Sequence, residues 1–155
     1  MELPERNIGF LLHDVARLMR KRFEQNARDL GLTRSQCQVL AHLSRHEGIQ
    51  QGSLAEILEV EPITLTRILD RLEEAGLVER GAHPTDRRVR LLRLTKRAHP
   101  MLNEIFAIGA ITRSEALDGV AEAERDRLFA ILASMKANLL RKAASTTGDR
   151  RASHG

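Results

Sequence analysis

Hydrophobic residues recur three or four positions apart through most of the chain, which is the spacing of amphipathic helices. The first stripe predicts a helix over residues 8–30 and comprises Ile8, Leu11, Leu12, Val15, Leu18, Met19 and Phe23. Gly31 is expected to end this helix. A second helix is predicted to begin after Thr33, because Thr33 and Gln36 have the spacing of a capping box. Its inward positions are Val39, Leu40 and Leu43.

The next two predicted helices are shorter and lie close together. One covers about residues 51–58, and the other has Pro62 in its first turn, where a missing N–H removes no helical hydrogen bond. Gly76 stands where a left-handed C-cap residue belongs. The buried stripe of the second helix comprises Leu65, Ile68, Leu69 and Leu72. Two helices joined by so few residues have the arrangement of a helix-turn-helix unit.

A different pattern begins at residue 77. Residues 77–78 and 89–94 are predicted to be strands, and the turn-rich residues 81–86 between them predict a β-hairpin. A short helix, a tight turn, a second helix and a basic hairpin together make a winged helix-turn-helix. The expected fold class is therefore mainly α with a small β-hairpin.

Two long helices are predicted after the hairpin, over residues 96–118 and 122–145. Pro100 falls in the early part of the first of them, so we expect a bend there. Residues 146–155 are small, polar and basic, and they are expected to form a disordered tail. Long helices are thus predicted on both sides of the winged unit.

The composition narrows the possible functions. The 155 residues are 42% hydrophobic and 30% charged, which suits one domain with a buried core. The four aromatic side chains are all Phe, which argues against proteins that stack single-stranded bases on exposed rings. The single cysteine, Cys37, excludes an intramolecular disulfide, and a reducing cytoplasm is the expected setting. We expect no membrane segment and no secretory signal, because the apolar runs are short and the first residues lack a cationic start.

Positive charge is concentrated in one segment. Seven basic residues lie between Arg80 and Arg97 and are opposed only by Asp86, so this segment carries a net +6, against +4 for the whole chain. A concentrated positive patch on a nearly neutral body is typical of proteins that bind polyanions. The alternative is an ordinary solvated face.

The predicted helix after Pro62 can present this chemistry to DNA. Its buried leucine stripe leaves Thr64, Arg67 and Arg71 on one open stripe, at positions i, i+3 and i+7. Such a stripe can face base edges and phosphates in a major groove. Arg67 has the reach and the fork geometry to bind guanine through two hydrogen bonds.

The hairpin tip adds a second candidate contact. Arg87 and Arg88 are expected within reach of an adjacent minor groove, whose negative potential attracts guanidinium groups. Asp86 is either an orienter of Arg88 or an ordinary turn residue. The residues expected to bind DNA are Pro62, Thr64, Thr66, Arg67, Arg71, Arg87, Arg88 and Arg90.

Four motifs follow one another across the predicted winged unit. They are Leu54-Ala55-x-x-Leu58, Thr64-x-x-x-Ile68-Leu69-Asp70-x-Leu72-Glu73-x-x-Gly76-Leu77-Val78-x-Arg80, Asp86-x-Arg88 and Leu94-Thr95. Together they resemble the MarR family of transcriptional regulators, and the resemblance extends over about residues 8–142. Two further details, Asp86-Arg87-Arg88 and Asp14-x-Ala16-Arg17-Leu18, are similar to the SlyA-like branch of that family.

The resemblance implies a homodimer that binds pseudo-palindromic double-stranded operators, and we expect the chain to act as a repressor. Its first and last helices would interlock with those of a second copy, which fits their many apolar residues. Residues 1–32 and 96–145 would form the dimerisation region, and residues 33–95 the DNA-binding lobe. Two lobes would then meet half-sites roughly one helical turn, ~34 Å, apart.

The resemblance also implies a pocket for a small-molecule effector, typically an aromatic acid, between the dimerisation arms and the DNA-binding lobe. Arg17 and Arg20 match positions at which SlyA-like members engage a carboxylate, and either can pair with such an anion through two hydrogen bonds. The alternative is an ordinary surface arginine pair. Cys37, Ala41 and His42 are candidate pocket walls.

Peroxide sensing and zinc sensing are two other possible modes of regulation. Some relatives sense peroxide through a cysteine supported by tyrosines, whereas Cys37 has apolar neighbours and the chain has no tyrosine, so an inert buried thiol is expected. A zinc-responsive regulator is an alternative that would use His42, His46 and Glu47, with His99 and Glu104 approaching from elsewhere. We expect no metal and no cofactor.

Two further classes of function are an enzyme and an architectural DNA binder. An enzyme is rejected, because the chain has no phosphate-binding glycine loop, no nucleophile elbow and no H-E-x-x-H motif. A ligand-independent architectural or anti-silencing DNA binder stays open beside the effector-released repressor. Only a ligand effect on operator affinity separates the two, because phosphate contacts make both sensitive to salt.

Overall fold

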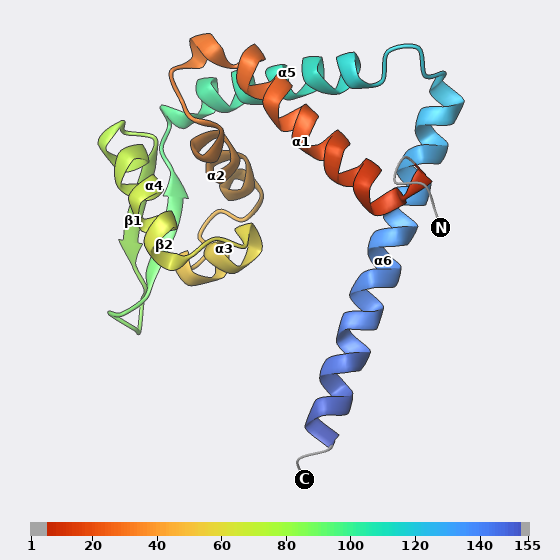
Figure 1. The fold of residues 1–155 in the computed structure, drawn as a ribbon. Coiled ribbons are helices and arrows are strands. Elements are labelled where there is room, and N and C mark those ends of the chain that lie inside the picture. Colours follow the sequence, from red (N-terminus) through yellow and green to blue (C-terminus); the bar gives the residue numbers. More distant parts are fainter. Residues whose placement is uncertain (1–5, 153–155) are drawn as a thin grey trace. The chain divides into compact units, whose positions relative to one another are not determined.

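The computed structural model describes residues 6–152 and divides the chain into two compact units, Met1–Ala116 and Leu117–Gly155 (Figure 1). The helices and strands of the first unit are α1 (Ile8–Asn26), the 3-10 turn η2 (Arg28–Leu30), α2 (Arg34–Arg45), α3 (Gln51–Leu58), α4 (Pro62–Glu74), β1 (Val78–Ala82), β2 (Arg90–Leu94) and α5 (Ala98–Ala116). The second unit is built on α6 (Glu122–Ala152). The predicted class, mainly α with one antiparallel hairpin, is confirmed.

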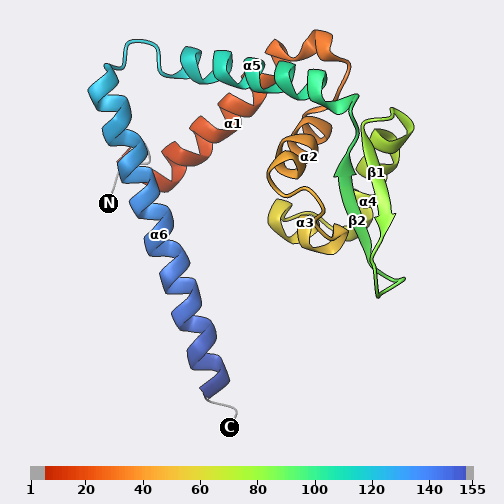
Figure 2. The same ribbon diagram turned by 180° about the vertical axis from the view of Figure 1, so that it is seen from behind.

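The core of the first unit lies where α2, α3 and α4 gather beside the hairpin, as Figure 2 shows from behind. Its largest fully buried side chains come from all of these elements and are Leu40, Leu43, Leu54, Leu65, Leu69, Leu72 and Leu92. The first turns of α5 close the core with Ala98, Leu102 and Ile105. Leucine burial of this kind is the main force that holds the short helices in place.

The helix ends follow the local signals in the sequence. The capping box is confirmed, because Thr33 Oγ1 accepts the Gln36 N–H at 3.1 Å and Gln36 Oε1 accepts the Thr33 N–H at 2.9 Å. The first helix is shorter than the predicted 8–30, because α1 ends at Asn26 and Gly31 follows the 3-10 turn η2 instead. Gly31 and Gly76, the latter after α4, both have left-handed backbone, with φ of 76° and 73°, where a side chain would add strain. Pro62 opens α4 as predicted.

The hairpin is longer than predicted, because β1 continues through Gly81 and Ala82, which had been expected in the loop. The register pairs Val78 with Leu94 and Ala82 with Arg90. On its other side β2 meets the segment before α3 through an isolated bridge between Gln50 and Leu91. The loop at the tip therefore comprises residues 83–89.

The bend expected at Pro100 has no physical cause in the structure. The helix begins at Ala98, so Pro100 lies in its first turn, where a missing N–H removes no helical hydrogen bond. Farther along, α5 is tied to α1 by polar contacts. Asn26 Nδ2 donates to Thr112 Oγ1 at 3.1 Å and to Glu115 Oε1 at 2.9 Å, and Arg22 pairs with Glu115.

The second unit differs from the prediction at its end. The expected disordered tail began at residue 146, whereas α6 continues through Ala152, and residues 153–155 lie outside the described residues. Thr146 and Thr147 hydroxyls donate back to the carbonyls of Lys142 and Ala143, each at 3.0 Å, so these polar side chains are satisfied within the helix. Among residues 6–152, no helix is both long and apolar enough to cross a membrane.

Candidate nucleic-acid interface

The open face of α4 carries the predicted stripe. Leu65, Leu69 and Leu72 are fully buried, and this orientation leaves Thr64, Arg67 and Arg71 exposed on the opposite side of the helix. The three exposed residues lie at i, i+3 and i+7, so they form one continuous row along α4. A helix fixed by its leucines that offers one hydroxyl and two guanidinium groups has the chemistry needed to bind DNA in a major groove.

Thr66, another predicted DNA contact, also makes two hydrogen bonds within the fold. Its hydroxyl accepts a hydrogen bond from Gln51 Nε2 at 3.0 Å and donates one to the Pro62 carbonyl, also at 3.0 Å. Both contacts are internal, and the first joins α3 to α4. Thr66 therefore helps to fix the angle between the two helices, and its hydroxyl proton is already engaged.

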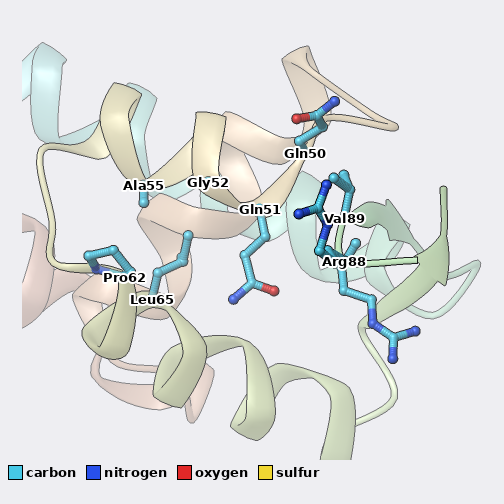
Figure 3. Close-up of a pocket in the computed structure, with 9 residues that line it drawn as sticks. Gln50, Gln51, Gly52, Ala55, Pro62, Leu65, Arg88 and Val89 are labelled. Carbon is cyan, nitrogen blue, oxygen red and sulfur yellow. The ribbon is translucent and has the colours of Figure 1, made fainter. Parts of the chain in front are cut away.

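A groove of about 400 Å³ runs between the start of α3, the start of α4 and the hairpin (Figure 3). Gln51 extends from α3 toward α4, and Pro62 and Leu65 lie on the α4 side. The hairpin contributes Arg88, Val89 and Arg90 to the lining. The groove thus joins the α4 face to the basic hairpin and brings Pro62 and Arg90, two predicted DNA contacts, to one surface.

At the hairpin tip, Asp86 holds Arg88. Asp86 Oδ1 accepts the Arg88 backbone N–H at 3.0 Å and the Arg88 Nε–H at 3.3 Å. These two hydrogen bonds, the backbone bond first, lower the pKa of the Asp86 carboxyl. The Arg88 side chain remains 92% exposed. This geometry agrees with Asp86 as an orienter of an outward-directed Arg88, and Arg87 beside it is also exposed.

Arg80 joins the hairpin to α4, a contact that the sequence analysis did not include. From β1, its guanidinium group pairs with Asp70 and donates from Nε to Glu73 Oε2 at 3.1 Å. Hydrogen bonds to Glu73 and Asp70 raise the pKa of Arg80. Asp70 and Glu73 are at i and i+3 on one helix, and this spacing could have indicated a shared cationic partner. Part of the positive charge counted between Arg80 and Arg97 is therefore neutralised within the fold.

A second pocket, of about 340 Å³, lies between α1, α2 and α5. Three arginines from three different helices line it, Arg20, Arg34 and Arg113. Phe23 and Phe106 add aromatic surface. Arg34 Nε also donates to Glu24 Oε1 at 3.1 Å.

The structure brings only some of the predicted effector residues to this pocket. Arg20, Cys37 and Ala41 line it, whereas the lining described for it includes neither Arg17 nor His42. Arg17 lies half-exposed beside Asp14, 3.7 Å away. Cys37 is only 2% exposed, and burial raises the pKa of its thiol. Arg34 and Arg113 were missed, because their approach depends on how the helices pack.

One of the residues considered as a zinc ligand, Glu47, has a structural contact instead. Glu47 Oε1 accepts the Leu94 backbone N–H at 3.1 Å, so its carboxylate fastens β2 to the loop after α2. Within the part of the chain that the structure describes, no three His, Cys, Asp or Glu side chains are grouped closely enough to hold a metal ion.

The sequence and the fold are similar to those of known transcriptional regulators. The model of the MarR family matches residues 32–89. The crystal structure of MarR is 26% identical, with a TM-score of 0.83, and the match covers 94% of this chain and 99% of that one. The crystal structure of the transcriptional regulator PA3341 is 37% identical, with a TM-score of 0.76, and the match covers 87% and 99%. A cysteine-to-serine mutant of MarR from E. coli, complexed with operator DNA, is 27% identical, with a TM-score of 0.73. That match covers 87% of this chain and 99% of the mutant's chain.

Proposed function

The chain belongs to the MarR family of DNA-binding transcriptional regulators, and we propose that it acts as a homodimeric repressor on a pseudo-palindromic double-stranded operator. The observation that carries the proposal is the row of Thr64, Arg67 and Arg71 on the open face of α4, beside a hairpin that directs Arg88 outward. We also infer a place in the SlyA-like branch, from the motifs of the sequence. The protein would be located in the bacterial cytoplasm and would lie on the nucleoid while it is bound to DNA.

Arg67 is proposed to supply base preference. It stands at the centre of the α4 row and has the length and the fork to bind guanine in the major groove. Arg67→Ala is therefore expected to relax the base preference at one position of each half-site. An equal loss of affinity on all sequences would show that Arg67 contacts phosphate instead.

Arg88 is proposed to enter the minor groove that flanks each half-site. Its side chain is almost fully exposed, and Asp86 restricts its direction. Arg88→Ala is expected to weaken binding most on operators whose flanks have a narrow minor groove, because the negative potential is strongest there. Equal losses on A·T-rich and G·C-rich flanks would contradict minor-groove insertion.

The homodimer is proposed from the apolar surface of the long helices. On α1, Phe10 and Leu11 are more than half exposed, and on α6 the same is true of Leu139 and Leu140. Several exposed apolar side chains on each of these helices are typical of a protein–protein interface. Light scattering on the full chain is expected to give twice the monomer mass, and a monomer at micromolar concentration would refute this assignment.

A small anionic aromatic effector is proposed for the pocket between α1, α2 and α5. The guanidinium groups of Arg20 and Arg113 suit a carboxylate, and Phe23 and Phe106 suit an apolar ring. Binding there would lower operator affinity only if the ligand prefers the conformation that binds DNA less well. Arg113→Ala should abolish the ligand response, whereas the control Arg17→Ala, outside the pocket lining, should retain it.

The test of the whole proposal is a fluorescence-anisotropy titration on DNA from upstream of the chain's own gene. Scrambled DNA serves as the reference at the same fixed salt concentration, since phosphate contacts make all affinities salt-dependent. The titration is repeated with a panel of aromatic carboxylates. Specific binding released by one compound would support the effector-controlled regulator. Specific binding that no compound weakens would favour the ligand-independent architectural binder, and equal affinity for scrambled DNA would contradict recognition of this site.

A further inference from the structure

The loop at the tip of the hairpin, residues 83–89, is held by hydrogen bonds that do not belong to the sheet. The His83 N–H donates to the Val89 carbonyl at 3.3 Å, and the Val89 N–H donates to the Asp86 carbonyl at 3.2 Å. Pro84 has no N–H. Beyond these bonds, the loop needs acceptors for the N–H groups at its centre, which face no opposite strand.

The imidazole of His83 supplies one of these acceptors. Its Nδ1 accepts the backbone N–H of Thr85 at 3.2 Å and that of Asp86 at 3.1 Å. The Thr85 hydroxyl lies 3.3 Å from the same nitrogen. Since both backbone groups can only donate, this geometry requires Nδ1 to act as an acceptor, with the ring hydrogen on Nε2.

The hydrogen bonds accepted by His83 and by Asp86 follow one another along the loop. Nδ1 of His83 fixes the backbone at Asp86, and the Asp86 carboxylate then accepts two hydrogen bonds from Arg88. The loop lies at the surface, where few apolar contacts could hold it otherwise: Thr85, Arg87 and Arg88 are all exposed. The direction of Arg88 thus depends on an acceptor five residues earlier in the chain.

We propose that His83 is a positioning residue for DNA binding, which acts as a neutral hydrogen-bond acceptor at Nδ1 and preorganises the loop that presents Arg87 and Arg88. The proposal rests on the proposed function for its effect on DNA affinity. A loop that is already ordered loses less conformational entropy on binding than one that must be ordered by the DNA. Removal of the acceptor is expected to reduce operator affinity about tenfold, because the two N–H groups share the single lone pair of Nδ1 and each bond is weaker than an ordinary one.

The variants follow from the geometry of the ring. In asparagine the side-chain oxygen is bonded to Cγ, as Nδ1 is in histidine, so His83→Asn retains an acceptor at that position. His83→Ala removes it. His99→Ala is the matched control, because it removes an exposed histidine from the first turn of α5, away from the tip of the hairpin.

The affinity of each variant for the operator is measured by anisotropy against scrambled DNA, with thermal unfolding as the check on folding. Specific affinity is expected to fall about tenfold in His83→Ala, to be largely restored in His83→Asn and to be unchanged in His99→Ala. Equal affinity of His83→Ala and the unsubstituted protein would overturn the proposal, as would equal losses in His83→Ala and His83→Asn.

A measurement without DNA separates this proposal from the proposed function. Nitrogen NMR of the full chain is expected to show His83 with a hydrogen on Nε2 and none on Nδ1, and slowed hydrogen exchange at the Thr85 and Asp86 amides. His83→Ala should remove that protection, and His83→Asn should preserve it. A hydrogen on Nδ1, or unprotected amides in the unsubstituted protein, would overturn the positioning role whether or not the chain binds DNA. Protected amides with no specific DNA binding would contradict the proposed function alone.

Discussion

Arg80→Ala is expected to loosen the attachment of the hairpin to α4. The Arg80 side chain is only 20% exposed, and its guanidinium group pairs with Asp70 and with Glu73 at once. The two carboxylates are 52% and 46% exposed, so solvent screens both pairs, and exposed pairs contribute about 0.2–1 kcal/mol each. Adding the lost packing of the arginine stem, we expect the free energy of unfolding to fall by about 1.5 kcal/mol.

Urea unfolding followed by circular dichroism measures this loss. Protein concentration must be held fixed, since the midpoint for a dimer depends on it. Arg80→Lys should lose about half as much, because an ammonium group is a point charge and cannot engage both carboxylates as a planar fork can. The control Arg87→Ala removes the same charge from the exposed loop and should leave the free energy of unfolding within about 0.5 kcal/mol of that of the unsubstituted protein.

The outcome that would refute this reasoning is an equal midpoint for Arg80→Ala and Arg87→Ala. A double-mutant cycle with Asp70→Asn gives a second test, since the two substitutions should be less than additive if the groups interact. Additive effects would show that Arg80 stabilises the lobe through packing alone. High salt should shrink the difference between Arg80→Ala and the unsubstituted protein, because the pairs are partly exposed.

Three further outcomes are expected. The backbone N–H of Arg88, and after it the Arg88 side chain, lower the pKa of the Asp86 carboxyl, so the order that these contacts provide is complete above the ordinary carboxyl pKa and is lost as pH falls through the lowered one. Carbon NMR titration should show a higher Asp86 pKa in Arg88→Ala, which loses only the side-chain bond, and identical titrations would contradict that bond. Cys37 should react with a thiol reagent at neutral pH far more slowly than in urea, because burial raises its pKa, and equal rates would show that the thiol is open to solvent. Leu69→Ala should lower the free energy of unfolding by about 2–5 kcal/mol, because the Leu69 side chain is fully buried. The control Ile63→Ala, at an exposed position, should change it little. Similar losses for the two variants in urea unfolding would contradict the described core.

The fold was predictable where a few neighbouring residues decide the conformation. Thr33 and Gln36 form a reciprocal cap, and Gly76 takes up the left-handed turn that its place after α4 required. The open row of α4 was predictable for the same reason, since helical spacing alone separates buried from exposed positions. Loop boundaries do not follow from neighbouring residues alone: Gly81 and Ala82 belong to β1 because their backbone pairs with β2.

The features that the sequence could not predict depend on contacts between distant segments. Arg34 and Arg113 meet at one pocket only because α2 and α5 pack together, and no local pattern marks either residue. The role of His83 depends on the path of its own loop, which places two N–H groups at one ring nitrogen. The family resemblance implied a shared role for Arg17 and Arg20, whereas only Arg20 lines the pocket and Arg17 lies beside Asp14.

The pairing of β2 with the segment before α3 has a consequence for solubility. A two-stranded hairpin exposes two rows of unpaired backbone groups, and each can recruit a strand from another molecule and begin aggregation. On the outer side of β2, the Gly48 N–H donates to the Leu92 carbonyl at 2.7 Å and the Leu92 N–H donates to the Ile49 carbonyl at 2.9 Å. This chain therefore occupies one of the two edges with its own backbone, and β1 presents a row of only five residues to its neighbours.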